Sequence, residues 1–186
     1  ISALAHFSPI GRAHWVLCQV LGMYFARHSD AAGVLVVDAD TFLLQKRTWI
    51  NSSGRQLLSF SLEYHQPYEE HSIILYGRRK RHHGLSYVTH YMLMQPRILA
   101  DLFPNDQSFI DWITAGDPNE PSAVGDYHIY GRWLTDNYPR RWSMGRWLNK
   151  ALLWTIPPGT APAKALGLIR IAAAGSFSAS SHRWME

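Results

Sequence analysis

The sequence predicts an α/β fold, and three observations lead to this prediction. Residues 12–28 space their apolar side chains as a helix does, and Ser29, Asp30 and Gly33 mark the end of that helix. Residues 34–37, VLVV, follow as a short strand that is apolar on both faces, which is typical of a buried parallel strand. A helix followed by such a strand is half of a βαβ unit, and strand and helix patterns alternate further along the chain.

The later segments continue this alternation. Runs rich in apolar, aromatic and β-branched residues predict extended segments at 56–64, 71–77 and 86–94. Helices are predicted at 96–103, with Pro96 in the first turn, and at 106–116, 126–138 and 141–156. IPPGTAPAKA (156–165) is typical of a linker, and the tail 167–186 is expected to hold one strand and then a loop. We therefore expect one domain over residues 1–186, with 157–186 as a C-terminal appendage.

The composition indicates a folded protein with an affinity for anions. Hydrophobic residues make up 47% and charged residues 17%, which is enough apolar material for a core and excludes a disordered tail. The single cysteine, Cys18, excludes an intramolecular disulfide and a multi-cysteine zinc site. Fourteen Arg against four Lys contribute to a net charge of +4, which suits an anionic substrate or a membrane surface. The charge is too diffuse to indicate nucleic acid, so we expect no nucleic-acid partner.

Asp38 and Asp40 follow the predicted strand directly, at the end of the strand where ligands collect in open α/β sheets. Because side chains alternate along a strand, two residues that are two apart can point toward one site. Two carboxylates so close repel each other unless a cation lies beside them, and Mg²⁺ or Mn²⁺ prefers such oxygen ligands. The plain alternative is a polar turn after a core strand.

One chemistry for this pair is phosphoryl transfer. VLVVDADT resembles the opening strand of haloacid-dehalogenase-like hydrolases. That resemblance implies that Asp38 is the nucleophile of a phosphatase and Asp40 its acid/base. The family also needs a late G-D-x-x-x-D, and here Asp126 is followed four residues later by Tyr130. We therefore rank this function second.

The other chemistry is metal-assisted transfer from a nucleotide sugar. GRAHWVLCQVLGMYFARHSDAAGVLVVDADTFLLQK (11–46) resembles the core of GT-A glycosyltransferases, and more narrowly a largely uncharacterised bacterial family of them. Four later segments support the resemblance by their order along the chain: LEYHQPYEEH, SYVTHYMLMQPRILADLF, GDYHIYGRWL and SFSASSHRW. The resemblance therefore covers residues 12–184. It implies a GT-A-like (Rossmann-like), mostly parallel sheet flanked by helices. Only 37 residues precede Asp38, so most of the N-terminal nucleotide-binding segment is expected to be absent. Either the chain is a fragment, or a partner or a degenerate binding mode supplies that half, which puts activity of the chain alone in question.

The resemblance also assigns roles to the donor-side residues. Asp38 and Asp40 would hold Mn²⁺ or Mg²⁺ and the donor diphosphate, and His182 would be the third metal ligand. The plain alternative for His182 is an exposed histidine in the tail.

On the acceptor side, the resemblance makes Asp126 the catalytic acid that orients or deprotonates the acceptor hydroxyl, with Tyr127 beside it. His90 and Tyr91 would line the sugar pocket. The alternatives are a helix N-cap for Asp126 and a core histidine for His90.

The expected function is therefore a metal-dependent glycosyltransferase of bacterial surface polysaccharide synthesis, using a nucleotide-sugar donor and a glycan or lipid-linked acceptor. No signal peptide and no membrane-spanning helix are expected, so we place it in the cytoplasm, peripheral to the inner face of the membrane. The basic run GRRKRHHG (77–84) and the segment 141–156 are the candidates for contact with that membrane. The plain alternatives are a solvated loop for the first and packing against the core for the second. The third alternative is a non-catalytic domain that binds a partner or membrane through the basic run.

Overall fold

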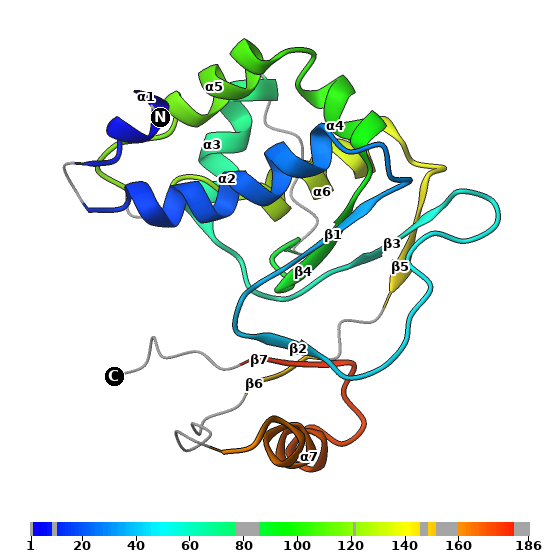
Figure 1. Cartoon of the computed structure of the whole chain (residues 1–186). Coiled ribbons are helices and arrows are strands. Elements are labelled where there is room, and N and C mark those ends of the chain that lie inside the picture. The colour runs from blue at the N-terminus through cyan, green and yellow to red at the C-terminus, as the bar shows by residue number, and fades with distance from the viewer. Residues whose placement is uncertain are drawn as a thin grey trace.

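The computed structural model describes residues 2–8, 11–76, 86–120, 122–145, 149–151 and 160–180. Helices α1–α6 gather on one side of the strands, and α7 lies on the other side (Figure 1). The helices are α1 (Ser2–Ala5), α2 (Ala13–Arg27), α3 (Gln66–Tyr76), α4 (Pro96–Leu102), α5 (Asp106–Thr114), α6 (Asp126–Asn137) and α7 (Pro162–Ala172). The strands are β1 (Val34–Val37), β2 (Thr41–Leu43), β3 (Gln56–Ser59), β4 (Tyr91–Met94), β5 (Trp142–Gly145), β6 (Asn149–Ala151) and β7 (Ser178–Ser180). The predicted α/β class is confirmed.

The strands form three small sheets of mixed direction. β1 pairs antiparallel with β4, and β3 pairs parallel with β5. β7 lies between β2, to which it is antiparallel, and β6, to which it is parallel. Within the described residues, the expected mostly parallel sheet is therefore replaced by this mixed set, and β1 is half-buried along its length rather than fully buried. An apolar run indicates that a strand is covered, but it does not reveal the direction of the neighbouring strand.

Four of the predicted helices are confirmed as α2, α4, α5 and α6, with ends that differ by at most two residues. Their local signals are strong: Pro96 occupies the first turn of α4, and Asn105 forms a capping box with Ser108 at the start of α5. None of the helices in the described ranges combines the length and the apolar character that crossing a bilayer requires.

Three other segments differ from the prediction. The strand predicted at 71–77 lies mostly within α3, because a short apolar run does not distinguish a helix from a strand. The helix predicted at 141–156 is replaced, in its described part, by β5 and β6. β5 owes its form to pairing with the distant β3, which no local pattern reveals. The tail, predicted as a strand and a loop, holds most of α7 ahead of β7, and α7 begins inside the predicted linker.

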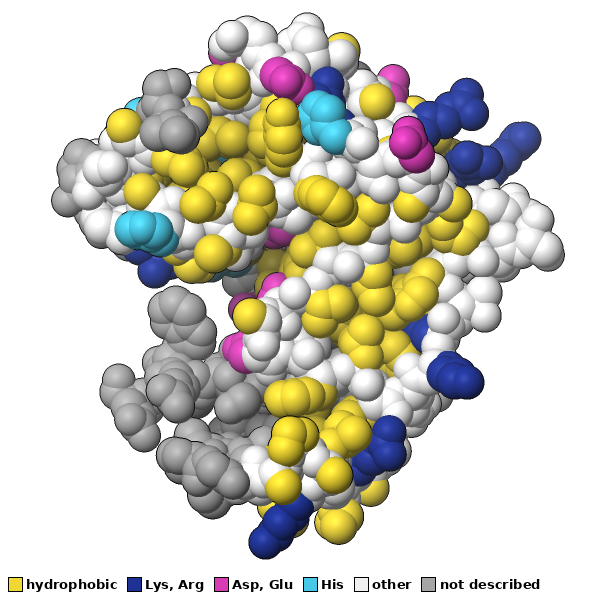
Figure 2. All heavy atoms as spheres, viewed as in Figure 1, with side chains coloured by type: hydrophobic (Ala, Val, Ile, Leu, Met, Phe, Trp, Pro, Cys, Tyr) yellow, Lys and Arg dark blue, Asp and Glu magenta, His cyan; other side chains and the backbone are white. Residues whose placement is uncertain are grey.

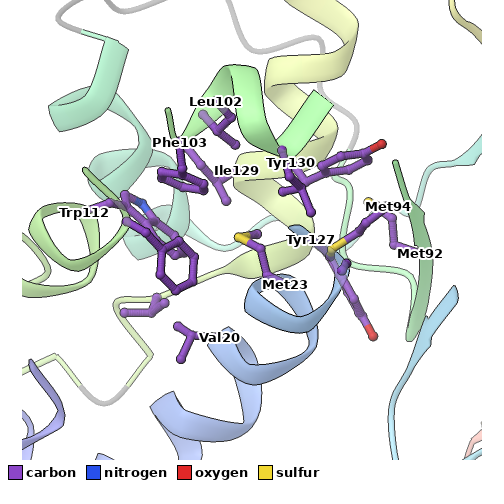
Figure 3. Packing of buried hydrophobic residues seen from close by; sticks show 14 of the residues in the cluster. Val20, Met23, Met92, Met94, Leu102, Phe103, Trp112, Tyr127, Ile129 and Tyr130 are labelled. Carbon is purple, nitrogen blue, oxygen red and sulfur yellow. The ribbon is translucent and has the colours of Figure 1, made fainter. Parts of the chain in front are cut away.

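The largest core cluster lies between the helices and β4 (Figure 3). α2 contributes one stripe of buried side chains, among them Val16, Val20 and Met23, at helical spacing. β4 contributes Met92 and Met94 from the face that points toward the helices. This packing fixes the helices on the β1–β4 pair, and so fixes the end of β1 relative to the start of α6.

A buried amide joins β3 to β4 and α6. Gln56 is fully buried, and its Nε2 donates to the carbonyl oxygen of Leu93 at 2.6 Å. Its Oε1 accepts from the Tyr130 hydroxyl at 2.8 Å and from Nε2 of Gln95 at 3.1 Å. The polar atoms of the Gln56 side chain are thus satisfied far from water, as buried polar groups require.

Candidate functional site around Asp38

Asp38 stands where β1 ends, and both of its carboxylate oxygens are held. Oδ1 accepts a hydrogen bond from the Tyr127 hydroxyl at 2.7 Å, and Oδ2 lies 3.1 Å from Nδ1 of His90. The backbone N–H of Asp38 donates to the carbonyl oxygen of His90 at 2.9 Å. The side chain nevertheless remains 37% exposed. Asp38 is therefore an oriented carboxylate that a solute can reach.

His90 holds Asp38 from an unusual backbone conformation. Its φ is +61°, in the left-handed region that side chains other than glycine seldom adopt, and the residue is buried. Such a conformation persists only where the surroundings enforce it, and it is concentrated at functional sites. Here the surroundings include two contacts with Asp38, one through the backbone and one through the imidazole. His90, which was predicted to line the sugar pocket, thus lies in direct contact with Asp38.

α6 brings Asp126 and Tyr127 to the same place. Asp126 is the first residue of α6, with Gly125 rather than Asp126 at the N-cap, and it is 4% exposed. Burial raises the pKa of the Asp126 carboxyl well above its ordinary value; a hydrogen bond from the backbone N–H of Tyr127 opposes this, and the charge of Asp38 adds to it. Burial also raises the pKa of Tyr127, so its hydroxyl keeps the proton that it donates to Asp38.

Tyr68 of α3 completes this group, and nothing in the sequence pattern pointed to it. Its ring packs so closely on Gly125 that a Cβ there would lie 2.6 Å from the ring, which accounts for glycine at this N-cap. Burial raises the pKa of the Tyr68 hydroxyl, and the charges of Asp126 and Asp38 raise it further. Tyr68 is therefore a protonated hydroxyl near both carboxyl groups.

Asp40 lies in the turn that leads from β1 to β2. The backbone N–H of Thr41 donates to the carbonyl oxygen of Asp38 at 2.9 Å, so residues 38–40 turn rather than continue the strand. The strand alternation expected to align the two aspartates does not apply there. The charge of Asp40 still contributes to the raised pKa of Tyr127, whose hydroxyl binds Asp38. Asp38 and Asp40 therefore both affect the Tyr127 hydroxyl, Asp38 through a hydrogen bond and Asp40 through its charge.

Asp38 and Asp40 offer carboxylate oxygens, the type of ligand that a hard divalent cation prefers. Each Asp38 oxygen accepts one contact, and a carboxylate offers about four lone-pair sites, so capacity remains. Mg²⁺ is commonly held by one or two carboxylates together with substrate phosphates, rather than by a cage of protein ligands. Over the ranges that the structure describes, no group of three or more His, Cys, Asp or Glu side chains could hold a metal. His182, the expected third ligand, lies outside the described residues.

Tyr91, predicted to line the sugar pocket, is placed away from this group. It is 2% exposed and packs edge-on against Trp49 and Phe177, with ring centroids 5.5 and 5.4 Å away. Met92, the next residue, faces the helices instead, as alternation along a strand requires. The geometry therefore joins Asp38, His90 and Tyr127, and it separates Tyr91 from them.

A buried ionic network supports α6 from behind. Glu69 of α3 pairs with Nη1 of Arg132 through Oε1, and its Oε2 lies 3.1 Å from Nε2 of His128. Burial alone would raise the pKa of Glu69, but the hydrogen bonds from His128 and Arg132 outweigh it and lower the pKa to about 2. The network fastens α6 to α3, and so keeps Asp126 and Tyr127 in place.

A groove between α1, α2 and α5 has a volume of about 300 Å³, but it offers no such chemistry. Its lining is apolar, with Leu17, Leu21 and Ile110 among the residues, and its one charged lining residue, Asp106, is bonded to Arg27. The site around Asp38 is therefore the stronger candidate for function.

Comparisons with protein-family models, with curated proteins and with solved structures found no significant match to this chain. The functional argument consequently rests on the residues of the chain itself.

Proposed function

We propose that this chain is a metal-dependent, GT-A-like glycosyltransferase domain, which moves a sugar from a nucleotide-diphosphate donor to an acceptor hydroxyl in bacterial surface polysaccharide synthesis. The observation that carries the proposal is the position of Asp126. A buried carboxyl with a raised pKa lies next to Tyr127, which is hydrogen-bonded to the oriented Asp38. A base candidate thus stands beside carboxylates that suit a cation.

On the donor side, Asp38 and Asp40 would hold Mn²⁺ or Mg²⁺, with His182 as the expected third ligand. Such an ion would supply positive charge to neutralise a diphosphate leaving group. Tyr127 and His90 hold the Asp38 carboxylate in one orientation, so that little reorganisation is needed when the donor binds. The Asp38 side chain is 37% exposed, so the donor approaches from its side.

On the acceptor side, Asp126 accepts the proton of the attacking hydroxyl. Because burial raises the pKa of the Asp126 carboxyl, its carboxylate is a stronger base than that of an ordinary aspartate. Tyr68, protonated and close to Asp126, donates a hydrogen bond that orients the sugar. The acceptor is a glycan or a lipid-linked glycan, at the cytoplasmic face of the membrane.

No observation favours the phosphatase alternative over this proposal. Tyr130, which stands where that chemistry needs a second late acid, is a core residue bonded to Gln56 and Gln95. Asp38, which would be the nucleophile, has both oxygens engaged by Tyr127 and His90.

The test is thermal stabilisation by UDP, GDP and CMP, each with and without Mn²⁺. A ligand that binds the folded state stabilises it by about 2.7 kcal/mol at a hundredfold excess over Kd. We expect one nucleotide to raise the melting temperature only with Mn²⁺, and the shift to disappear in Asp40→Asn. Asp30→Asn, an exposed aspartate in the loop before β1, is the matched control and keeps the shift.

Two outcomes contradict the proposal. A chain that gains no stability from any of the nucleotides does not bind the donor. Release of phosphate from small phosphoesters with Mg²⁺, abolished by Asp38→Asn, assigns Asp38 to the phosphatase instead.

A further inference from the structure

Acidic and basic residues are segregated along this chain. Residues 41–62 and 137–185 contain ten Lys or Arg and no Asp or Glu. Residues 1–40 and 63–136 contain eight Lys or Arg and 13 Asp or Glu. We call the first set the acid-free region and the second set the helical region. The acid-free region contains β2, β3, β5, β6, β7 and α7.

Within the acid-free region, α7 is covered on one side only. Ile169 is fully buried and Ala173 is 2% exposed, and both pack on Ala179 of β7. Leu168 and Ile171 point elsewhere and are 38% and 77% exposed. A helix whose exposed side is also aliphatic is typical of one that an apolar medium or partner covers.

The strands beside α7 extend this apolar and basic surface. Phe42 of β2 and Lys150 of β6 are both register partners of Ala179, so their side chains lie on the sheet face that α7 covers. Phe42 is 39% exposed, and Lys150 is exposed. Together with the exposed side chains of α7 they form the α7 surface: Phe42, Lys150, Lys164, Leu168, Arg170 and Ile171. In Figure 2, hydrophobic side chains flanked by Lys or Arg cover the lower end of the molecule, over α7, without an Asp or Glu.

We propose that the α7 surface binds an anionic phospholipid bilayer, with α7 lying in the interface. Aliphatic side chains enter the headgroup boundary while neighbouring cations pair with lipid phosphates. Nucleic acid would match the cations but leave Leu168 and Ile171 in water. A second copy docked symmetrically would place cations against cations. The inference stands apart from the proposed transfer reaction. It adds α7 to the expected membrane contacts; of these, 77–84 lies outside the described residues and 141–156 is described only in part.

The experiment is sedimentation of the full chain with vesicles. One set is phosphatidylcholine alone, and the other contains about one third phosphatidylglycerol, which makes it anionic. We expect binding to the anionic vesicles only. The double variant Lys164→Gln/Arg170→Gln lowers the vesicle–water partition coefficient about 25-fold, because each cation near an anionic surface raises that coefficient about fivefold. Leu168→Ser/Ile171→Ser weakens it about tenfold or more, because the aliphatic insertion is lost.

Two exposed residues of the helical region provide matched controls. Arg97→Gln removes a cation from α4 and Phe25→Ser removes an aromatic side chain from α2, where it is 68% exposed. Both are expected to leave partitioning unchanged. Circular dichroism verifies that each variant is folded. Amide hydrogen exchange of the wild-type chain tests the proposal without any substitution. We expect anionic vesicles to slow the exchange of the α7 amides.

Five outcomes overturn the proposal. The first three are no sedimentation with anionic vesicles, equal binding to neutral vesicles, and controls that lose as much binding as the α7 variants. The fourth is self-association in sedimentation velocity that Ile171→Ser abolishes, which assigns the surface to a second copy. Binding of duplex DNA that depends on Lys164 and Arg170, without vesicle binding, assigns it to nucleic acid and overturns the proposal in the same way.

Discussion

The helical region and the acid-free region differ in where they keep their charges. The helical region buries ionisable groups: Asp126 is 4% exposed, and Glu69, at 8%, contacts the buried His128 and Arg132. In the described part of the acid-free region, the polar residues that are buried are neutral, among them Gln56 and the serines of β7, while its lysines are exposed. Buried charge is costly unless it is matched, so its presence marks a support network or a reactive site.

This difference separates two kinds of function within one chain. The helical region supplies oriented and titratable groups, which suit chemistry on a bound substrate. The acid-free region supplies exposed cations beside aliphatic side chains, which suit contact with a surface. The following predictions probe that separation, from the largest expected effect to the smallest.

The largest effect is expected at Asp126. If it is the base, Asp126→Asn lowers the rate of sugar transfer about 10²–10⁴-fold, because the amide cannot accept the proton of the acceptor hydroxyl. Nucleotide affinity is unchanged, since Asp38 and Asp40 remain. Single-turnover transfer, measured beside nucleotide binding, separates the two steps. Normal transfer in this variant would remove Asp126 from the chemistry, while Asp30→Asn shows the background effect of a lost surface carboxylate.

Next in size is the effect of Glu69→Gln on stability. It removes the closer of the two carboxylates that pair with the buried Arg132 guanidinium and leaves the more distant Asp136, at 3.8 Å, so we expect a loss of about 3 kcal/mol in the free energy of unfolding. Urea unfolding measures it. Glu70→Gln, at an exposed neighbouring position, changes the free energy by less than about 0.5 kcal/mol. Equal effects in the two variants would mean that the network adds nothing to stability.

The same network predicts a pH dependence. The pKa of Glu69 is lowered from 4.5 to about 2 in the folded chain, by hydrogen bonds from His128 and Arg132 that outweigh burial. Its contribution to stability is therefore complete above pH 4.5 and is lost as the pH falls through about 2. Unfolding free energies measured across this window fall less steeply for Glu69→Gln than for the wild type. Parallel curves would show that Glu69 does not carry the effect.

The smallest effects compare two mid-helix glycines. In α6, a Cβ on Gly131 would lie 2.4 Å from the Tyr87 ring, so Gly131→Ala forces that ring to move and costs about 1–3 kcal/mol. In α7, a Cβ on Gly167 meets nothing within 4 Å, so Gly167→Ala gains about 0.5–1 kcal/mol of helix propensity. Thermal unfolding of both variants measures this. Loss of stability in Gly167→Ala would contradict the open environment of α7.

What the sequence could predict depended on how local the signal was. α4 and α5 carry their start signals in Pro96 and the Asn105–Ser108 box, so both were predictable. β5 has no comparable signal, because its partner β3 lies far away in the sequence. The antiparallel direction of β1 could not be predicted for a similar reason, because the pairing of β1 with β4 is a property of the folded chain.

The site shows the same limit. Asp38 was selected from an acid pair after a strand, while Asp126, Tyr127 and His90 were selected from the family resemblance. The left-handed backbone of His90 and the packing of Tyr68 on Gly125 arise only when distant segments meet. Sequence therefore named these residues, and the fold revealed that His90 and Tyr127 hold Asp38 and that Tyr68 lies beside them.

The buried amide of Gln56 has a consequence for how the molecule opens. Gln56 belongs to the acid-free region, but Leu93, Gln95 and Tyr130, which it contacts, belong to the helical region. Separating the two regions would leave these buried polar groups without hydrogen-bond partners, so unfolding of one region without the other is unfavourable. The amides of β3 and β4 are therefore expected to exchange with solvent in one cooperative event. Two regions of opposite charge character are thus tied into a single unit of unfolding.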